Sequence, residues 1–404
     1  MNTVLCIFIC ALMLSGCVNN EKNDDNPKVE AKYLAIDIEK MREIKQSIDE
    51  KKDWKALEYY NSLILKADSI LTNGYNYTIV NKKILPPSGD VHDYISMAIY
   101  RWPNPDTNDG LPYIVKDGEI NPEARTKYTD AGVKIKLCED IKTLGLAYFY
   151  SGDDKYVTRA NDIIRCFFID PETKMNPNFN HGQLAPGINM GRSAGIIESS
   201  QFSEVMEGVT LISESDKWPD NTDRQLKEWF GEYLKWLTTS EFGLDARKLR
   251  NNHGTNYDKL CCCIYLFLSQ YENAAKHINL YTKPRIKSHI KDDGLQPLEV
   301  GRTKSWGYTT MNCRTFTQIA VMGERVGVDL WYGKEGERSY LKTMIDWFIP
   351  YVTGDKEWKW NQIIRVSVKN IEWPLDMAFR HYKDEKYLDA IKKFHTIHEN
   401  IVME

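Results

Sequence analysis

The sequence predicts an all-α fold in which helical hairpins close into an incomplete ring, an (α/α) toroid with long cleft-forming loops. Three observations support this fold class. Apolar residues recur at helical spacing, a hairpin pattern returns near the end of the chain, and no run of alternating residues is long enough for a major sheet.

The clearest helical pattern lies just after residue 130. Apolar side chains share one face of a predicted helix at Val133, Leu137, Ile141, Leu144 and Tyr148. The turn Ser151-Gly152-Asp153-Asp154 ends this helix, and a second apolar stripe follows at 156–167. The passage 378–387 repeats the spacing of 147–156, which indicates repeated hairpins. Further helices are expected at 38–48, 54–71, 201–213, 223–239, 257–280, 311–326 and 339–351.

Two long loops, 86–125 and 170–195, are polar and punctuated by Gly and Pro. Loops of this length in a compact domain are more often functional than idle. No linker rich in Pro or Ser divides the chain after residue 30. We therefore expect one toroidal domain over 31–404, preceded by a signal peptide at 1–17 and a flexible tether at 18–30.

The N-terminus predicts export. The apolar run Val4 to Leu14 is too short to span a bilayer and ends in Leu14-Ser15-Gly16-Cys17, which resembles a bacterial lipobox. The resemblance implies lipidation at Cys17, and a residue other than Asp at position 18 favours an outer-membrane lipoprotein facing the periplasm or the cell surface. The alternative is a cleaved secretory signal in which Cys17 is incidental. Residues 1–3 carry no Lys or Arg, so the usual positive n-region is missing.

Composition excludes several classes of function. The formal net charge of −4 argues against a general nucleic-acid binder, and a polyanionic substrate would need cationic groups gathered in a cleft. The sequence contains no C-x-x-C, no H-E-x-x-H, no phosphate-binding loop and no nucleophile elbow. We expect no metal and no cofactor. The six cysteines after Cys17 are expected to be buried thiols, with a disulfide left open.

Four polar stretches are rich in catalytic residue types: 97–123, 178–192, 251–255 and 299–312. Three of their motifs occur in a particular order. These are Trp102-Pro103-Asn104-Pro105 with the Asp-Gly-Leu-Pro-Tyr that follows, then Asn251-Asn252-His253, and then Arg302-Thr303-Lys304-Ser305 with Tyr308. Together they resemble the alginate-lyase-like superfamily of polysaccharide lyases over roughly 80–375. The resemblance implies a toroid that cleaves mannuronate- or glucuronate-containing polymers without metal. It also implies a His/Tyr pair assisted by Asn and Arg, which fall on His253, Tyr308, Asn252 and Arg302.

β-Elimination explains why such residue types are needed. Removing the C5 proton of a uronate makes a dianionic enolate, so neutralising the carboxylate with Asn, His or Arg lowers the cost. A base takes the proton and an acid protonates the departing O4. Tyrosine has a pKa of about 10, and we expect a nearby Arg or His⁺ to lower it. One Tyr could serve as both base and acid, or His could take the proton and Tyr return one.

Each site residue also has a structural interpretation. Asn252 could cap a helix starting near Tyr257, and His253 could simply bond a carbonyl. His181 is a fifth catalytic candidate, as base, carboxylate neutraliser or subsite contact, with loop ordering nearly as probable. Candidate substrate contacts come from the same stretches, with a scaffold role also open for Trp102: Arg192, Asn180, Gln183, Trp102, Lys304 and Trp306.

The sequence therefore predicts a lyase acting on alginate or glucuronan, anchored to the membrane through Cys17 and making no contact with nucleic acid. Two alternatives stay open. One is a glycoside hydrolase on a similar toroid, which needs paired acids for which Asp293 and Glu299 are candidates. The other is a non-catalytic surface lipoprotein that binds glycans.

Overall fold

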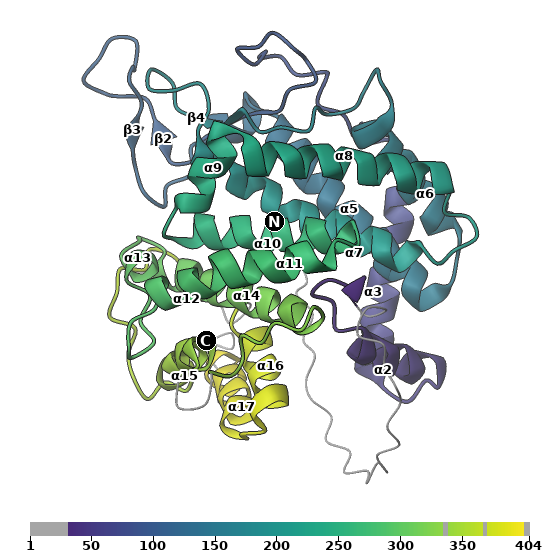
Figure 1. Cartoon of the computed structure of the whole chain (residues 1–404), viewed down its shortest axis with the longest axis vertical. Helices are drawn as coiled ribbons and strands as arrows, with labels where there is room; N and C mark the ends of the chain where they lie inside the picture. Colours follow the sequence, from purple (N-terminus) through teal and green to yellow (C-terminus); the bar gives the residue numbers. More distant parts are fainter. Residues whose placement is uncertain (1–30, 334–337, 367–369, 400–404) are drawn as a thin grey trace.

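The computed structural model describes residues 31–333, 338–366 and 370–399, and helices dominate it (Figure 1). The predicted signal peptide, the tether and Cys17 lie outside these residues. No helix in the described ranges combines the length and the apolar content needed to cross a bilayer.

The first half of the described chain contributes helices on one side of the ring, interrupted by the two long loops. They are α2 (Ile38–Asp49), α3 (Trp54–Leu71), α4 (Glu123–Thr126), α5 (Asp130–Ser151), α6 (Lys155–Ile164), η1 (Arg165–Ile169), η2 (Ser193–Gln201), α7 (Phe202–Ile212), α8 (Asp220–Thr239) and α9 (Glu241–Lys248). The second half continues with α10 (Asn252–Phe267), α11 (Tyr271–His277), η3 (Ile278–Thr282), α12 (Lys283–His289), α13 (Pro297–Val300), α14 (Ser305–Glu324), α15 (Tyr340–Val352), α16 (Glu372–Tyr382) and α17 (Lys386–Glu399).

The two passages with similar spacing both form hairpins. α5 and α6 are joined through Gly152, which has a φ of 70° and donates its N–H to the carbonyl of Tyr148. α16 and α17 are joined through Lys383, which occupies the matching position with a φ of 54° and donates to the carbonyl of Phe379. Both helices thus end on a left-handed residue. The predicted repeat is confirmed.

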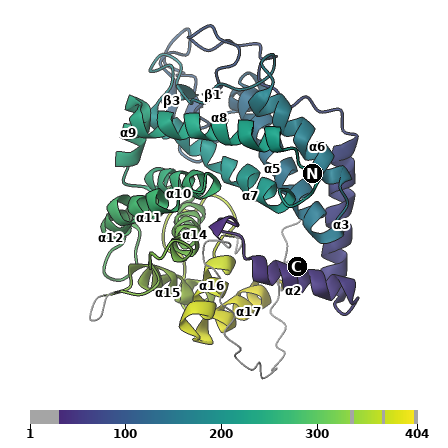
Figure 2. The ribbon, with the colours of Figure 1, turned by 45° about the vertical axis from the view of Figure 1, so that its right-hand side comes forward.

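The helices follow one another around a ring. α3 packs on α5, α5 on α7, α7 on α10, α10 on α14, and α14 on both α15 and α16 (Figure 2). The apolar core includes side chains from all of these helices. The predicted all-α toroid is confirmed, and the six described cysteines are free thiols, with Cys166 the one that is partly exposed.

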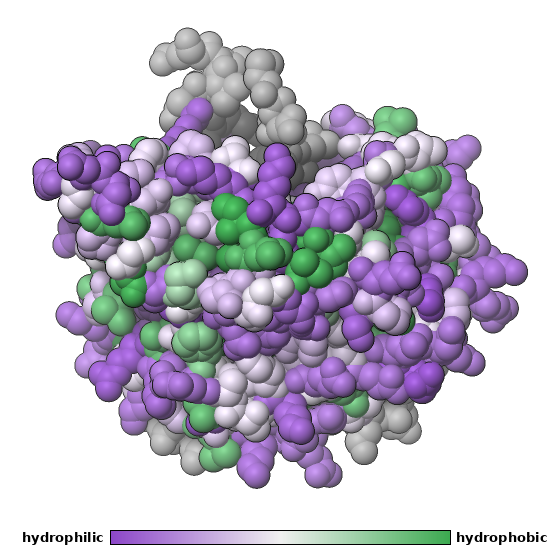
Figure 3. Space-filling view, turned by 90° about the horizontal axis from the view of Figure 1, so that it is seen from above, coloured by the Kyte–Doolittle hydropathy of each residue, from purple (hydrophilic) through white to green (hydrophobic). Residues whose placement is uncertain are grey.

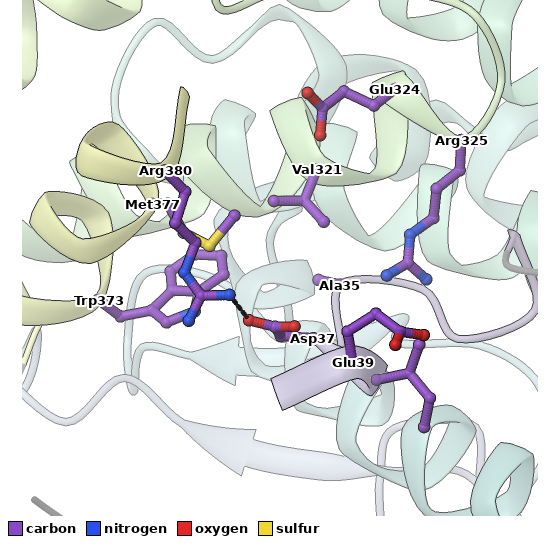
Figure 4. Close-up of a pocket in the computed structure, with 10 residues that line it drawn as sticks. Ala35, Asp37, Glu39, Val321, Glu324, Arg325, Trp373, Met377 and Arg380 are labelled. Carbon is purple, nitrogen blue, oxygen red and sulfur yellow. Dashed lines mark hydrogen bonds and ion pairs between the residues drawn. The ribbon is translucent and has the colours of Figure 1, made fainter. Parts of the chain in front are cut away.

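The beginning and the end of the described chain meet beside α14. Asp37, just before α2, forms an ion pair with Arg380 of α16 (Figure 4). A cavity of about 260 Å³ lies there, between the segment that precedes α2, the C-terminal end of α14, and α16. None of the predicted site residues lines this cavity, so it marks the seam of the ring and not the predicted cleft.

The two long loops pair with each other above the helices (Figure 1). β1 (Ile95–Met97) runs parallel to β4 (His181–Leu184), with Ile95 opposite His181 and Met97 opposite Leu184. β2 (Arg101–Trp102) runs antiparallel to β3 (Ile114–Val115). Seen from above, this end of the molecule shows a group of apolar side chains amid hydrophilic ones (Figure 3).

Two predicted helices have wrong boundaries, and both begin earlier than expected, at residues of the site. The helix expected at 257–280 begins at Asn252 and ends at Phe267, and it is separated from α11 by a turn in which Ser269 has a φ of 58°. The helix expected from residue 311 begins at Ser305. Periodicity missed both first turns because they contain polar side chains. Asn252, His253 and Tyr308 therefore belong to helices and not to loops.

Candidate active site

Asn252 lies at the start of α10 and is held by a carboxylate from α13. The side chain of Asn251 accepts a hydrogen bond from the backbone N–H of His253 at 3.2 Å, so Asn251 and not Asn252 caps the helix. Asn252 donates its backbone N–H to Oε1 of Glu299 and its Nδ2 to Oε2, each at 2.7 Å. Both residues are buried, and burial raises the pKa of Glu299. This pairing fixes the orientation of the Asn252 amide.

His253 is held as a neutral imidazole. Its Nδ1 lies 2.9 Å from the carbonyl oxygen of Ala194, which can only accept, so Nδ1 carries the proton. Burial, together with the positive charges of Arg192 and Arg302, lowers the pKa of His253 to about 4, although the hydrogen bond to Ala194 acts to raise it. No hydrogen bond from the described residues occupies Nε2. A neutral ring with a free Nε2 lone pair can accept a proton.

Arg302 is clamped by a carboxylate from the first long loop. Its Nε and Nη2 donate to the two oxygens of Asp117 at 3.2 and 2.5 Å. The backbone N–H and hydroxyl of Thr303 donate to the same carboxylate at 3.0 and 2.9 Å. These hydrogen bonds, that of Arg302 first, lower the pKa of Asp117 to about 2. The next residue, Gly118, has a φ of +84°, and a Cβ there would lie 2.5 Å from Oγ1 of Thr303.

Tyr308 lies one turn into α14, against Arg302. Nη2 of Arg302 donates to its phenol oxygen at 2.9 Å, and the guanidinium carbon lies 3.9 Å from the ring centroid. The phenol donates to the hydroxyl of Tyr100 at 3.0 Å. Burial and the bond to Tyr100 raise the pKa of Tyr308 although Arg302 acts to lower it. The expectation that a nearby Arg lowers this pKa was wrong for the unliganded site, because loss of hydration outweighs one cation. Tyr308 is a protonated phenol.

We call Asn252, His253, Arg302 and Tyr308 the helix wall. The second long loop supplies a second group of residues, His181, Gln183 and Arg192, which we call the loop wall. Arg192 donates to Oε1 of Gln183 at 2.7 Å, and its positive charge acts to lower the pKa of His253. His181 directs Nδ1 toward the carbonyl of Met190 at 3.2 Å, and no hydrogen bond joins it to a described residue of the helix wall. This hydrogen bond within the loop is the kind of contact that the loop-ordering interpretation of His181 predicts.

The loop wall depends on a close backbone approach. Gly191 has a φ of +152°, and a Cβ at this position would lie 1.9 Å from the carbonyl oxygen of Asn180. A side chain at position 191 would force the two strands of the loop apart. Asn180 itself accepts a hydrogen bond from Nε1 of Trp236 at 3.2 Å, so its amide oxygen is engaged with α8. This packing fixes the loop segment that carries Arg192.

The other predicted substrate contacts differ in their surroundings. Trp102 donates Nε1 to the carbonyl of Glu119 at 2.9 Å, as expected of a loop scaffold, and remains half-buried. Nζ of Lys304 lies 5.7 Å from the ring centroid of Tyr100, beside the helix wall. Trp306 is only 3% exposed and packs its ring against Phe348 and Trp358. The choice of Trp306 as a substrate contact is corrected, because its indole is part of the core.

Two buried polar atoms of the site lack a partner among the described residues. They are Nε of Arg192 and Oδ1 of Asn252. Buried polar atoms are nearly always paired in folded proteins, so orphaned ones on the two walls indicate a place for ligand atoms. The charges of Arg192 and Arg302 both act on His253, so the site is electropositive within a chain of negative net charge. No group of three or more His, Cys, Asp or Glu in the described ranges could hold a metal ion.

Comparison with known proteins assigns the family. The alginate lyase family model matches residues 78–358, which is more than half of the chain. This chain belongs to the alginate lyase family. It is a polysaccharide lyase on the (α/α) toroid. No curated protein matches it.

Solved structures agree with this assignment. An alginate lyase from Bacteroides ovatus is 33% identical, with a TM-score of 0.84, and the match covers 89% of this chain and 95% of that one. Alginate lyase A1-III from Sphingomonas species A1 shares the fold at 15% identity and a TM-score of 0.55, over 88% and 90% of the two chains. A variant of A1-III complexed with tetrasaccharide gives a TM-score of 0.60 at 15% identity, over the same shares.

Sequence reasoning missed three residues that hold this lyase's helix wall in place: Tyr100, Asp117 and Glu299. Asp117 lies 185 positions from Arg302, and Tyr100 lies 208 positions from Tyr308. Contacts between residues so far apart in the chain leave no recognisable pattern in the sequence around either residue. Glu299 was considered as one of a pair of hydrolytic acids with Asp293. In the structure both of its oxygens are taken by Asn252 and Asp293 is exposed, so these two residues do not form such a pair.

Proposed function

We propose that this lyase cleaves alginate by β-elimination, leaving a 4,5-unsaturated uronate end, and that it needs no metal. The proposal rests on the protonation states of two groups beside Arg302, one of which can accept a proton while the other can donate one. His253 is neutral with a free Nε2, whereas Tyr308 retains its phenolic proton. The similar proteins of known structure are named alginate lyases, which supports alginate as the substrate. Glucuronan, with a carboxylate at the same carbon, is a second substrate in this proposal.

The uronate carboxylate would be neutralised at the electropositive centre of the site. Arg192 and Arg302 provide charge there, and the second N–H of the Asn252 amide provides a donor that Glu299 does not use. Asp117 partly balances the charge of Arg302, but the ion pair also holds the guanidinium beside the ring of Tyr308. Donors fixed before the reaction stabilise the enolate without reorganisation.

The proton transfers then follow from the protonation states. Nε2 of His253 takes the C5 proton, and the electrons of that C–H bond form the C4=C5 double bond as the C4–O4 bond breaks. O4 receives the phenolic proton of Tyr308. The resulting phenolate is stabilised by Nη2 of Arg302 at 2.9 Å until His253 returns the proton through solvent.

One observation favours a second route. The hydrogen bond from Arg302 to the phenol oxygen would stabilise a phenolate once substrate has displaced the contact with Tyr100. After losing its phenolic proton to solvent, Tyr308 would take the C5 proton itself and deliver it to O4 as the C4–O4 bond breaks, with His253 assisting the carboxylate. The two routes require different arrangements of C5–H and O4, so mannuronate and guluronate blocks would separate them.

The test is a panel of mannuronate-rich alginate, guluronate-rich alginate and glucuronan, incubated with the full chain in the presence and absence of EDTA. We expect near-ultraviolet absorbance from the new double bond. The masses of the products should add up to the mass of the polymer, because elimination adds no water. EDTA should have no effect. New reducing ends without a double bond would indicate a hydrolase. Binding without any product would indicate a glycan-binding protein.

We also propose that residues 1–17 direct export and that Cys17 anchors the protein to the outer membrane. The support is the lipobox resemblance alone. Metabolic labelling with a fatty-acid probe should mark the wild-type chain and leave Cys17→Ala unmarked, whereas equal labelling of both would exclude this anchor.

A further inference from the structure

Four aromatic rings gather on α15 and the segment that follows it. They form one cluster with ring centroids between 4.8 and 5.7 Å apart, made of Trp347, Tyr351, Trp358 and Trp360. All four side chains are half-buried and none is fully enclosed. We call them the aromatic cluster. Half-exposed rings grouped in this way leave planar faces accessible to a ligand.

Three rings of the aromatic cluster, those of Trp347, Tyr351 and Trp360, line a cavity of about 490 Å³ together with Lys356 and Lys359. Both lysines are exposed, and Nζ of Lys359 lies 5.2 Å from the ring centroid of Trp360. Within the described part of the chain no carboxylate forms a salt bridge with either lysine. Their charge is therefore available to an anion.

Two carboxylates also line this cavity, and one of them, Asp346, forms ion pairs within the protein. Asp346 pairs with Lys342 at 2.7 Å and with Lys386 at 3.2 Å, so its charge is compensated within the protein. Asp293 is exposed and accepts the backbone N–H of Leu295 at 3.0 Å. The uncompensated groups that meet the rings are thus mainly cationic.

Hydrogen bonds connect the segment that follows α15 to residues beside the helix wall. Nε1 of Trp358 donates to Oγ of Ser305 at 2.8 Å, in the first turn of α14. An isolated antiparallel β-bridge pairs the backbones of Lys304 and Gln362, and the N–H of Ile363 donates to the carbonyl of Thr303 at 3.0 Å. The segment carrying Trp360 is thereby attached to the same residues that lie between Arg302 and Tyr308. A polymer held at the aromatic cluster would extend from a fixed position relative to the cleavage site.

We propose that the aromatic cluster with Lys356 and Lys359 is a second binding site for an acidic polysaccharide, separate from the residues that carry out cleavage. The apolar faces of pyranose rings would stack on Trp360 and Trp347, and uronate carboxylates would contact the lysines. The identity of the polymer as a polyuronate rests on the proposed function. Lys359 and Trp360 lie beyond residue 358, where the family match ends, whereas the other residues of the site lie within the matched region.

The site would act by retention. A polymer engaged at two places dissociates more slowly than one engaged only in the cleft, because the second contact is intramolecular once the first has formed. Long chains should benefit, and an oligosaccharide that reaches only the cleft should not. The difference between long and short substrates is the signature of this site.

The experiment compares two site variants with a matched control. Lys356→Glu/Lys359→Glu removes the positive charge, and Trp360→Ala removes the platform. The control Lys51→Glu/Lys66→Glu makes the same charge change at two exposed lysines. Lys51 lies in the turn after α2 and Lys66 lies on α3, on the other side of the ring (Figure 1). Binding of fluorescently labelled long polymannuronate is measured in a Tyr308→Phe background so that the polymer stays intact. Cleavage of a trisaccharide is measured with Tyr308 present.

We expect the charge variant to bind long polymer about tenfold more weakly and Trp360→Ala about fivefold more weakly than the control, with trisaccharide turnover unchanged in each. Equal polymer affinity of site variants and control would overturn the proposal. So would an equal loss with trisaccharide and polymer, which would place these residues in the cleft. If Trp360→Ala fails to fold, the exposed lysine pair still decides. A wild-type chain that binds polymer at this site yet forms no unsaturated product would refute the proposed function and leave this inference standing.

Discussion

The helix wall and the loop wall face the same electropositive site but are built differently. Asn252, His253 and Tyr308 lie in the first turns of two buried helices. His181 begins the short strand β4 and Arg192 directly precedes η2, and their side chains bond the carbonyl of Met190 and Gln183 within the same loop. Groups on rigid helices suit proton transfer, which tolerates little misplacement, whereas loop residues suit recognition of a substrate. Substitutions on the helix wall should therefore reduce turnover, and those on the loop wall should reduce affinity.

Tyr308→Phe tests the strongest form of this contrast. The variant keeps the ring against Arg302 but removes the proton that O4 needs, so we expect kcat to fall about a thousandfold with little change in KM. The measurement is steady-state absorbance of the unsaturated product. Tyr100→Phe is the control, since it removes only the hydrogen-bond partner of Tyr308 and should cost far less. If both variants lose the same activity, Tyr308 is not the proton donor.

His253→Ala should reduce kcat about a hundredfold. His92→Ala is the matched control, because His92 also bonds a backbone carbonyl, that of Lys174, outside either wall. The wild-type pH profile adds a second readout. A base must be neutral, and the pKa of His253 is lowered from 6.5 to about 4, so kcat/KM should stay high as pH falls through 6 and decline only near 4.

The same shift has a consequence for stability. The unfolded chain binds a proton at His253 below about pH 6.5 and the folded chain only below about 4, so the stability of the fold decreases as pH falls through that window.

The activity profile could instead increase toward alkaline pH and show no titration near pH 4. Such a profile would contradict His253 as the base and favour the route through Tyr308 alone.

How far these walls could be predicted from sequence depends on the range of the contacts. The hairpin repeat around Gly152 and Lys383 and the helices at 38–48 and 54–71 follow from local periodicity. The four helix-wall residues were found through motif resemblance. Their partners were not, because Asp117, Tyr100 and Glu299 reach them across the fold. Burial of Trp306 was also invisible, since a motif records residue type and not which face of a helix meets the core.

Glu299→Gln probes one of those unforeseen partners. Glutamine offers a single acceptor, so one of the two donors of Asn252 loses its partner and the amide is no longer held in one orientation. We expect kcat to fall about tenfold and the free energy of unfolding by about 1–3 kcal/mol, with the acid limb near pH 4 unchanged. The measurements are kinetics, with kcat and KM separated, and denaturant unfolding. Unchanged kcat in a destabilised variant would reduce Glu299 to a purely structural role.

His181→Ala should have the smallest effect. The lost hydrogen bond to the Met190 carbonyl loosens the loop wall, and we expect KM to rise about threefold while kcat stays within error, equivalent to about 0.7 kcal/mol. Kinetics on long polymer, with kcat and KM separated, provide the readout. A large fall in kcat would move His181 into the proton-transfer machinery and break the contrast between the two walls.

The clamp of Asp117 on Arg302 ties catalytic competence to a long loop outside the helical ring. The loop that carries Asp117 has few regular backbone pairs, and such segments open at a lower free-energy cost than helices. Each opening would release Arg302 while the helical ring remains intact. Heating should therefore inactivate the enzyme reversibly, at temperatures where its helical signal is still unchanged, and the upper working temperature would be set by this loop and not by the melting of the toroid.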